Sequence, residues 1–388
     1  MANVYGNGGT TATVDTAGYG TTRGNTVVHF YDRTGVKAAN RVNLYGQFAD
    51  RKSMPKKMGK TFKISKYLHM YDRALNDAEF DEKGFLSARS VDEVNIALAS
   101  ASLAEGAGAV NQRSLQKITM ETSLARYGEM IDYTDEVELF SEDSMQVRYR
   151  EELGELANSR MEDLIQLDML STPTVMYAGS ATSEVTIDED STVSYDLIRK
   201  AVRKLVRNRA KKNTSVVVGD VKIDTRTIDK AYYAIIGAQV KGDLELLTRG
   251  TVINNGMTEF VYIPSHKYAS AGTLTEGEVG AMHEVRFIES ESAVVYSGAG
   301  ADASAHTGTL SVSSGAFDVF PILFPTQNCF ATVGLKGQGK IKFNSKSPEV
   351  VENSNPYGTN GFFSYNFFYA GIILEEEKLL KVLVSASA

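Results

Sequence analysis

The sequence is poor in the side chains that build metal centres and covalent cross-bridges. Its 388 residues include a single cysteine, Cys329, which excludes an intrachain disulfide framework and a cluster of thiolate ligands. The histidines lack the H-x-x-x-H and H-E-x-x-H spacings of helical zinc sites. They are scattered at His29, His69, His266, His283 and His306. The sequence therefore predicts no catalytic residues, no bound metal and no other cofactor.

Long apolar runs and a surplus of positive charge are also missing. The longest strongly apolar stretch, residues 367–374, is far short of the roughly 20 residues that span a bilayer. The polar, Gly/Thr-rich start has no apolar core of a signal peptide. A net charge of −7 argues against a dedicated nucleic-acid binder, although it does not exclude a protein that lies beside DNA. We expect a soluble protein with no membrane partner, made in a reducing compartment.

The best candidate for a phosphate site is a glycine-rich segment near the end of the chain. Gly334 and Gly339-Lys340 have the spacing of a Walker A motif, but Ile341 stands where the motif needs Ser or Thr to bind magnesium. Residues 340–344 then alternate as a strand does, so no helix N-terminus follows to face a phosphate. The pattern favours a glycine-rich turn between two strands.

Acidic residues form three clusters that are local in sequence. A general acid/base pair needs two carboxyl groups in one concave site, and a calcium loop needs fixed spacing with a glycine. The clusters meet neither requirement, so we interpret them as solvated surfaces and the chain as a non-enzyme. They are Asp132/Asp135/Glu136/Glu138, Asp188/Glu189/Asp190 and Glu375/Glu376/Glu377.

A strand-rich excursion is predicted in the first third of the chain. Residues 61–67 alternate polar and apolar, and residues 116–132 have matching strand character. Between them, Ser90 and Glu93 have capping-box spacing, an Ala/Leu-rich run follows, and Gly106 sits where a C-cap belongs. A long, mainly two-stranded excursion with a helix near its tip is only marginally stable alone, which favours contact with a partner.

Two helices follow this excursion. Residues 141–171 can begin at the cap Ser141 and end before Pro173, and about 30 residues at 1.5 Å each give a rod of roughly 45 Å. Along its apolar stripe lie Tyr149, Leu153, Leu156, Ala157, Leu164, Ile165 and Leu167.

The second helix, residues 194–209, has a clean apolar face and a strongly basic remainder. The apolar face consists of Leu197, Ile198, Ala201, Val202, Leu205 and Val206. The basic residues are Arg199, Lys200, Arg203, Lys204, Arg207, Arg209, Lys211 and Lys212. This basic surface has three open interpretations: a solvated face, a contact with an acidic patch on a neighbouring subunit, or a weak contact with packaged DNA.

The rest of the chain reads as short strands separated by turns, which makes the predicted class α+β. The expected strands are residues 215–218, 260–263, 283–287, 293–296, 319–324, 362–373 and 381–384, with a low-complexity loop at 299–315.

The order of these features, together with several short motifs, resembles a known family. The motifs are Gly46-Gln47-Phe48-Ala49-Asp50, Pro55 with Gly59-Lys60-Thr61, residues 126–136 (RYGEMIDYTDE), residues 195–202 (YDLIRKAV) with Asn208, residues 276–280 (EGEVG), residues 285–289 (VRFIE), residues 355–358 (NPYG) and residues 368–374 (FYAGIIL). From about Asn40 onward the chain is similar to the major capsid proteins of N-four-like podoviruses, which have the Hong Kong 97-like fold.

The resemblance implies a domain plan. It places an N-terminal arm at 1–50, the E-loop with the start of the P-domain at 51–132, and the P-domain with its spine helix at 133–190. The A-domain would follow at 191–330, and return strands to the P-domain would occupy 331–388.

It also implies a function and partners. The chain would be a capsid subunit that self-assembles into hexamers and pentamers of an icosahedral phage head around double-stranded DNA, with E-loop and N-arm contacts to neighbours. Scaffolding, portal and decoration proteins would be further partners, and packaged DNA would be touched only weakly and non-specifically. Its place would be the virion capsid, assembled in the bacterial host cytoplasm. Some relatives crosslink through an E-loop lysine; Lys83 lies in that region, but no catalytic glutamate can be assigned.

Two alternatives remain at the level of the sequence. One is another virion structural protein, such as a decoration or tail-tube protein, which usually lacks so long a helix. The other is a soluble ligand-binding or metabolic domain, which would need a convergent polar pocket that the histidines and the cysteine do not offer. Assembly into megadalton particles would distinguish a capsid subunit from both.

Overall fold

A computed structural model describes most of the chain. The described residues are 44–67, 91–99, 101–103, 105–106, 115, 117–140, 145–218, 224–247, 261–268, 274–304, 306, 308–336, 341–351 and 355–388. The predicted N-terminal arm up to residue 43, Lys83, and the predicted caps Ser90 and Ser141 lie outside these residues.

A five-stranded sheet is built around one long strand, β16 (Asn360–Ile373). Residues 362–366 of β16 lie between β4 (Ala125–Thr134) and β15 (Lys342–Lys346), both antiparallel to it. The last four residues of β16 pair antiparallel with β14 (Phe330–Leu335). The strand β1 (Asp50–Met54) extends the sheet by parallel pairing with β14. Residues 362–373, predicted as a closing strand, therefore form the centre of this sheet.

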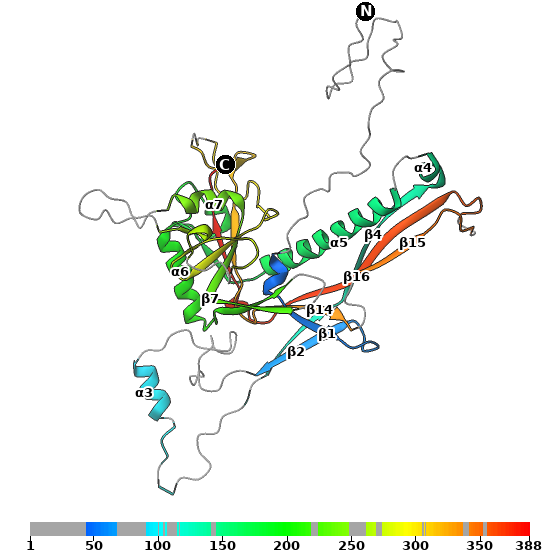
Figure 1. The fold of residues 1–388 in the computed structure, drawn as a ribbon. Coiled ribbons are helices and arrows are strands. Elements are labelled where there is room, and N and C mark those ends of the chain that lie inside the picture. Colours follow the sequence, from blue (N-terminus) through cyan, green and yellow to red (C-terminus); the bar gives the residue numbers. More distant parts are fainter. Residues whose placement is uncertain are drawn as a thin grey trace, which may run out of the picture.

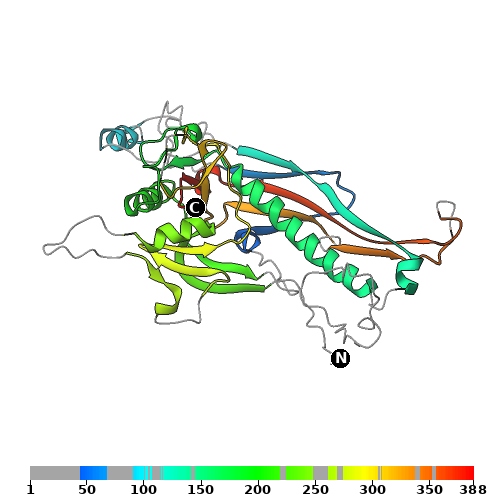
Figure 2. The ribbon, with the colours of Figure 1, turned by 90° about the horizontal axis from the view of Figure 1, so that it is seen from above.

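The spine helix α5 (Met145–Leu170) lies lengthwise along β4 and β16 (Figures 1 and 2). Its 26 residues span about 39 Å at 1.5 Å each, and the short helix α4 (Asp135–Phe140) precedes it. Leu153 and Ile165 of the predicted stripe are buried, which confirms the face that packs on the sheet. The stripe was wrong at Leu167, whose side chain is 55% exposed, because the helix turns this position toward solvent.

An eight-stranded sheet forms the other part of the molecule. Its order is β5 (Val175–Tyr177), β17 (Leu380–Val384), β13 (Phe320–Phe324), β7 (Asp224–Ile236), β10 (Val285–Glu289), β9 (Glu278–Met282) and β8 (Ile263–Pro264), and β6 (Asn213–Val218) also pairs with β7. The helices α6 (Tyr195–Arg207) and α7 (Ala238–Glu245) pack on one face of this sheet, against alternate residues of β7 such as Tyr232 and Ala234.

Shorter elements complete the described part of the chain. They are the hairpin strands β2 (Thr61–Tyr67) and β3 (Lys117–Ser123), the helix α3 (Val91–Ala99), the pair β11 (Val312–Ser313) and β12 (Ala316–Phe317), and the 3-10 turns Tyr45–Phe48, Glu184–Thr186, Ser265–Lys267 and Glu376–Lys378.

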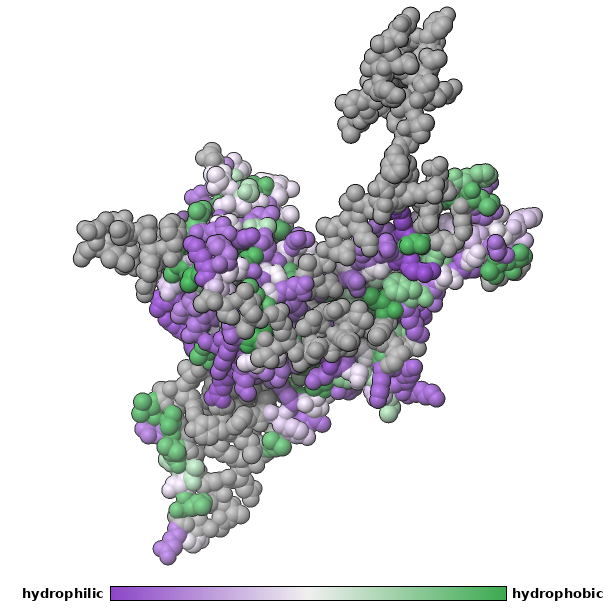
Figure 3. All heavy atoms as spheres, in the orientation of Figure 1, coloured by the Kyte–Doolittle hydropathy of each residue, from purple (hydrophilic) through white to green (hydrophobic). Residues whose placement is uncertain are grey.

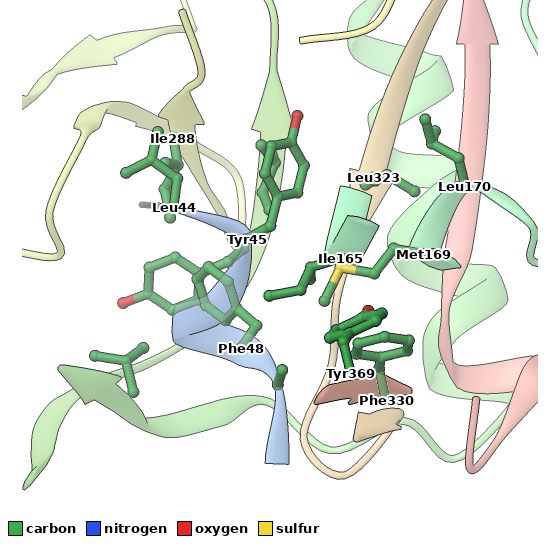
Figure 4. Packing of buried hydrophobic residues seen from close by; sticks show 14 of the residues in the cluster. Leu44, Tyr45, Phe48, Ile165, Met169, Leu170, Ile288, Leu323, Phe330 and Tyr369 are labelled. Carbon is green, nitrogen blue, oxygen red and sulfur yellow. The ribbon is translucent and has the colours of Figure 1, made fainter. Parts of the chain in front are cut away.

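The two sheets share one apolar cluster, which also holds the chain where it enters the fold (Figure 4). Tyr45 and Phe48 of the first 3-10 turn insert between Ile165 of α5 and Tyr233 of β7 in this cluster. The Phe48 and Tyr233 rings lie 5.3 Å apart between centroids. The cluster therefore joins the spine helix to both sheets.

A buried carboxylate fixes the same entry point. Glu162 of α5 is only 3% exposed and accepts hydrogen bonds from the backbone N–H groups of Tyr45 (3.0 Å) and Gly46 (3.2 Å). One turn further along α5, the Gln166 amide donates to the Tyr45 hydroxyl at 2.8 Å. Buried polar groups are stable only when paired, so these bonds fix both the turn and its position on the helix.

The helix α6 follows its predicted boundaries. The Ser194 hydroxyl caps it by accepting from the Leu197 N–H at 3.2 Å, and Asn208 is its C-cap. Leu197, Ile198, Ala201, Val202 and Leu205 are buried as predicted. The prediction was wrong at Val206, which is 56% exposed because it lies at the margin of the apolar face.

Several other predictions need correction. Residues 293–296 form no strand and contribute one isolated bridge at Tyr296. Of the predicted strand 260–263, residue 260 lies outside the described part, and among residues 261–263 only Ile263 lies in a strand. The helix of the excursion ends at Ala99, so Gly106, although its φ is +76°, is not its C-cap. Of the expected return strands, β14, β15 and β16 lie in the five-stranded sheet, whereas β17 lies between β5 and β13 in the eight-stranded sheet.

Candidate assembly interface

The hairpin formed by β2 and β3 separates its side chains into two faces. The antiparallel register places Phe62 opposite Thr122 and Ile64 opposite Met120, while Lys66 faces Ile118. These positions are half-buried, and the alternate positions of both strands are exposed. We call Phe62, Ile64, Ile118 and Met120 the hairpin apolar face.

The opposite face of the hairpin carries polar side chains that pair with one another across the two strands. Lys63 and Glu121 form a salt bridge of 2.7 Å directly across the strands, and the hydroxyls of Ser65 and Thr119 are 3.3 Å apart. Cross-strand pairs of this kind contribute about 0.2–1 kcal/mol each. This face is therefore suited to solvent, in contrast to the apolar one.

The base of the hairpin is fixed to the five-stranded sheet. The Thr122 hydroxyl donates to the Gly371 carbonyl at 3.0 Å, and the Lys66 ammonium pairs with Glu375 at 2.9 Å. Phe62 and Met120 pack against a small buried cluster that includes Leu124, Ala370 and Ile372. The hairpin thus leaves the sheet from a defined anchor, as Figure 1 shows.

A second group of exposed apolar side chains lies at the far end of the spine helix. Leu139 and Phe140 of α4 are 73% and 84% exposed, and Tyr357 in the turn before β16 is 88% exposed. Figure 3 shows hydrophobic atoms gathered at this end, near α4. The Asn355 side chain organises the turn by donating to the Asn360 carbonyl (2.9 Å) and accepting from the Thr359 N–H (3.0 Å). The exposed Tyr357 ring is therefore carried on a hydrogen-bonded turn.

The side chains that could bind a metal ion or act as a nucleophile do not gather in one site in the described part of the chain. Across the part of the chain that the structure describes, three or more His, Cys, Asp or Glu side chains nowhere group closely enough to hold a metal ion. Cys329 is fully buried, as predicted for a small apolar side chain, and burial raises the pKa of its thiol to about 12. The Walker-like segment begins in β14 and is followed by β15, so strands lie on both sides of it as predicted, while residues 337–340 lie outside the described part.

The acidic clusters are only partly the solvated surfaces that we predicted. Glu189 and Asp190 are exposed, in agreement with the prediction. Glu375 and Glu377 are half-buried instead: Glu375 pairs with Lys66, and Glu377 accepts from the Asn208 amide at 3.2 Å. The prediction failed there because the partners are distant in sequence.

The basic residues of α6 lie opposite its buried face and so remain mostly at the surface. Lys204 donates to the Val175 carbonyl at 3.0 Å, and Lys212 pairs with Glu284 at 2.8 Å. The hydrogen bond from Lys212 lowers the pKa of Glu284. Among the helices of the described residues, none is long and apolar enough to cross a membrane.

Comparison with solved structures defines the class of fold. The capsid protein of Ralstonia phage GP4 superposes with a TM-score of 0.57 at 11% identity, over 94% of this chain and 98% of that chain. The capsid proteins of cyanophages Pam1 and P-SCSP1u give TM-scores of 0.57 and 0.54, each at 10% identity, over 96% and 95% of this chain and 100% and 96% of theirs. The α+β architecture is thus the Hong Kong 97-like fold of phage capsid proteins, as the sequence predicted.

Sequence comparison defines the family. The chain is 30% identical over 353 residues to the major capsid protein of Pseudomonas phage KPP21, and the match covers 87% of each protein. The chain therefore belongs to the family of phage major capsid proteins, the structural subunits that associate into the shell of the virion. No protein-family model matches the sequence.

Proposed function

We propose that this chain builds the hexamers and pentamers of an icosahedral phage head that encloses double-stranded DNA, and that assembly takes place in the cytoplasm of the bacterial host. Membership of the major capsid family supports this proposal, as does the fold shared with several phage capsids. The role that we propose is structural and not enzymatic.

The domain plan accompanies this proposal. The five-stranded sheet with α5 corresponds to the P-domain, the β2–β3 hairpin to the E-loop, and the eight-stranded sheet to the A-domain, with boundaries near residues 50, 132, 190 and 330. Residues 1–50 would be the N-terminal arm. The positions of β5 and β17 in the eight-stranded sheet favour assigning residues 175–177 and 380–384 to the A-domain.

One observation carries the proposal: the hairpin apolar face. A two-stranded ribbon is only marginally stable in water, and this one presents Ile64 and Ile118 on a single face beyond the cluster that covers its base. Apolar surface of this kind becomes stable when a partner removes it from water, at about 25 cal/mol per Å². In a shell, the neighbouring subunit supplies that cover for every copy, and many such contacts add up.

Further partners follow from the role of a shell. Scaffolding and portal proteins would contact the assembling subunit, and decoration proteins would contact the finished surface. Packaged DNA would meet only weak, non-specific contacts, since the chain carries a net charge of −7.

The direct test is assembly of the chain alone. After expression in bacteria and size-exclusion chromatography, negative-stain electron microscopy is expected to show closed shells, or rings of five and six subunits. A small species that also stays small when a scaffolding protein of a related phage is co-expressed would contradict the proposal, above all if that species bound a metabolite tightly.

A further inference from the structure

The helix α6 carries most of its positive charges on one side. At about 100° per residue, Arg199, Arg203 and Arg207 recur at every fourth position and lie beside Lys200, on the side opposite the buried residues. Arg209 and Lys211 continue the positive surface past the end of the helix, and both are exposed. We call Arg199, Lys200, Arg203, Arg207 and Lys211 the basic face.

The subunit itself does little to neutralise this face. Arg199 approaches Asp196 at 3.5 Å in an exposed pair, which stabilises weakly. Among the described residues, no carboxylate forms a salt bridge with Lys200, Arg203, Arg207 or Lys211. Residues 195–212 contain eight Lys or Arg and one Asp, a net charge of +7 in a chain of net charge −7, so all other residues together carry −14. The rest of a second copy therefore carries a net negative charge.

A surface of opposite sign lies across the same sheet. Alternate residues of a strand point to opposite faces, and in β17 Val382 and Val384 pack in the cluster under α6, whereas Leu383 packs with Ile187 on the other face. The segment that contains Ile187 is acidic, and the Ala301 N–H donates to the Ile187 carbonyl at 2.8 Å, which brings a second acidic loop beside it. We call Glu184, Asp188, Glu189, Asp190 and Asp302 the acidic face. Segments 178–193 and 297–318 contain no Lys or Arg.

We propose that the basic face of one subunit binds the acidic face of the next copy around a capsomer. This inference rests on the proposed assembly into capsomers and adds the surfaces that meet. Two different patches on opposite faces of one sheet make a head-to-tail contact, and such contacts close into rings when the rotation allows. Charge complementarity across the contact speeds association and rejects wrong pairings, because like charges would meet.

Charge reversal with reciprocal rescue tests the pairing. R203E/R207E and E189R/D190R each place like charges at the contact, and each is expected to lower the yield of rings or shells at least tenfold. The four substitutions combined restore opposite signs and are expected to return the yield to within threefold of the unsubstituted chain. Yield is measured by light scattering and electron microscopy at matched protein concentration.

Two controls make the result specific. K56E/K267E changes the net charge as much as R203E/R207E does, at exposed lysines that belong to neither face, and is expected to assemble normally. Unfolding in urea should show that R203E/R207E remains folded, because exposed substitutions usually change stability by less than about 0.5 kcal/mol.

The outcomes separate this inference from the proposed function. If the unsubstituted chain assembles neither alone nor with a co-expressed scaffolding protein, the proposed function fails. If it assembles and the combined variant is no better than either pair, the contact between the two faces is wrong. If R203E/R207E forms normal shells but its binding to duplex DNA loses about 0.9 in salt slope for each removed cation, the basic face serves DNA phosphates and this inference is overturned.

Discussion

A single carboxylate on the spine helix holds the point where the chain enters the fold. Glu162 of α5 is buried, and its oxygens accept the N–H groups that begin the turn Tyr45–Phe48. An ionised acceptor makes a stronger hydrogen bond than a neutral one. The charge of Glu162 therefore matters as well as its shape.

Replacing Glu162 by Gln tests this role. E162Q keeps the size of the side chain but weakens two charge-assisted bonds, and we expect a loss of roughly 1.5–3 kcal/mol in the free energy of unfolding. Urea denaturation of the unassembled chain measures the change. E152Q, at an exposed position of the same helix, is the matched control and should stay within about 0.5 kcal/mol of the parent; equal losses in both variants would contradict the assignment.

Two further carboxylates respond to pH in opposite directions. Burial disfavours the charge of Asp318, but hydrogen bonds from Ser311 (2.7 Å), Ser313 (2.8 Å) and the Gly298 N–H (2.7 Å) outweigh it and lower the pKa below its usual 3.8. Burial raises the pKa of Asp168, and the hydrogen bond from the Tyr369 hydroxyl at 2.8 Å opposes that shift only in part.

The opposite directions of these two pKa shifts predict opposite pH dependences for the two variants. A lowered folded-state pKa contributes stability that is present above the unfolded pKa and lost as pH falls through the folded one. D318N should therefore be less stable than the parent at pH 7, with a difference that shrinks below about pH 4. A raised pKa acts in the reverse sense, so D168N should gain stability relative to the parent as pH rises from 3 to 7. Urea unfolding at a series of pH values measures both, and parallel curves for the two variants would refute the pair.

At the scale of elements, the two faces of the β2–β3 hairpin differ in whether the subunit itself provides their contacts. Its polar face is satisfied by its own cross-strand pairs, whereas Ile64 and Ile118 lack full cover within the subunit. A substitution on the apolar face should therefore harm association more than folding.

I64K/I118K is expected to reduce shell yield at least tenfold and to change the free energy of unfolding of the unassembled chain by less than about 1 kcal/mol, because both positions are only half-buried. S65K/T119K adds the same charges to the exposed face and is the control. Electron microscopy of equal protein amounts gives the yields. Equal assembly by both variants would show that no partner covers the apolar face.

Elements with a strong local period could be predicted from the sequence, and those defined by distant partners could not. Ser194 and the period of α6 gave both its ends, and the alternation of residues 61–67 gave β2. The strand β7 was missed because Tyr232 and Tyr233 are both buried, on opposite faces, so its sequence does not alternate. The apolar face of the hairpin could be predicted from the alternation of polar and apolar residues. Its anchor could not, because Lys66 pairs with Glu375, more than 300 positions away in the sequence.

At the scale of the whole molecule, the shared apolar cluster makes the two sheets one folding unit. Phe330 of β14 belongs to the five-stranded sheet, yet it packs in the same cluster as Tyr233 and Leu323 of the eight-stranded sheet. Loss of packing at Phe330 should therefore lower the stability of both sheets, which should unfold together.

F330A should cost about 3–5 kcal/mol, since the ring is fully buried. Calorimetry of the unassembled chain is expected to show one transition, shifted to lower temperature as a whole. F343A on β15, where the ring is 49% exposed, should shift it much less. Two separate transitions, only one of them moved, would mean that the sheets unfold independently.

The position of β17 sets the order in which the molecule can be completed. This strand lies between β5 and β13, and its residues Leu380, Val382 and Val384 are fully buried. Until residue 384 has been translated, β5 has no neighbour in the sheet and β13 exposes a bare edge. A nascent chain therefore cannot finish its eight-stranded sheet on the ribosome ahead of this strand, and a prematurely terminated product lacks a native sheet with which to join a growing shell.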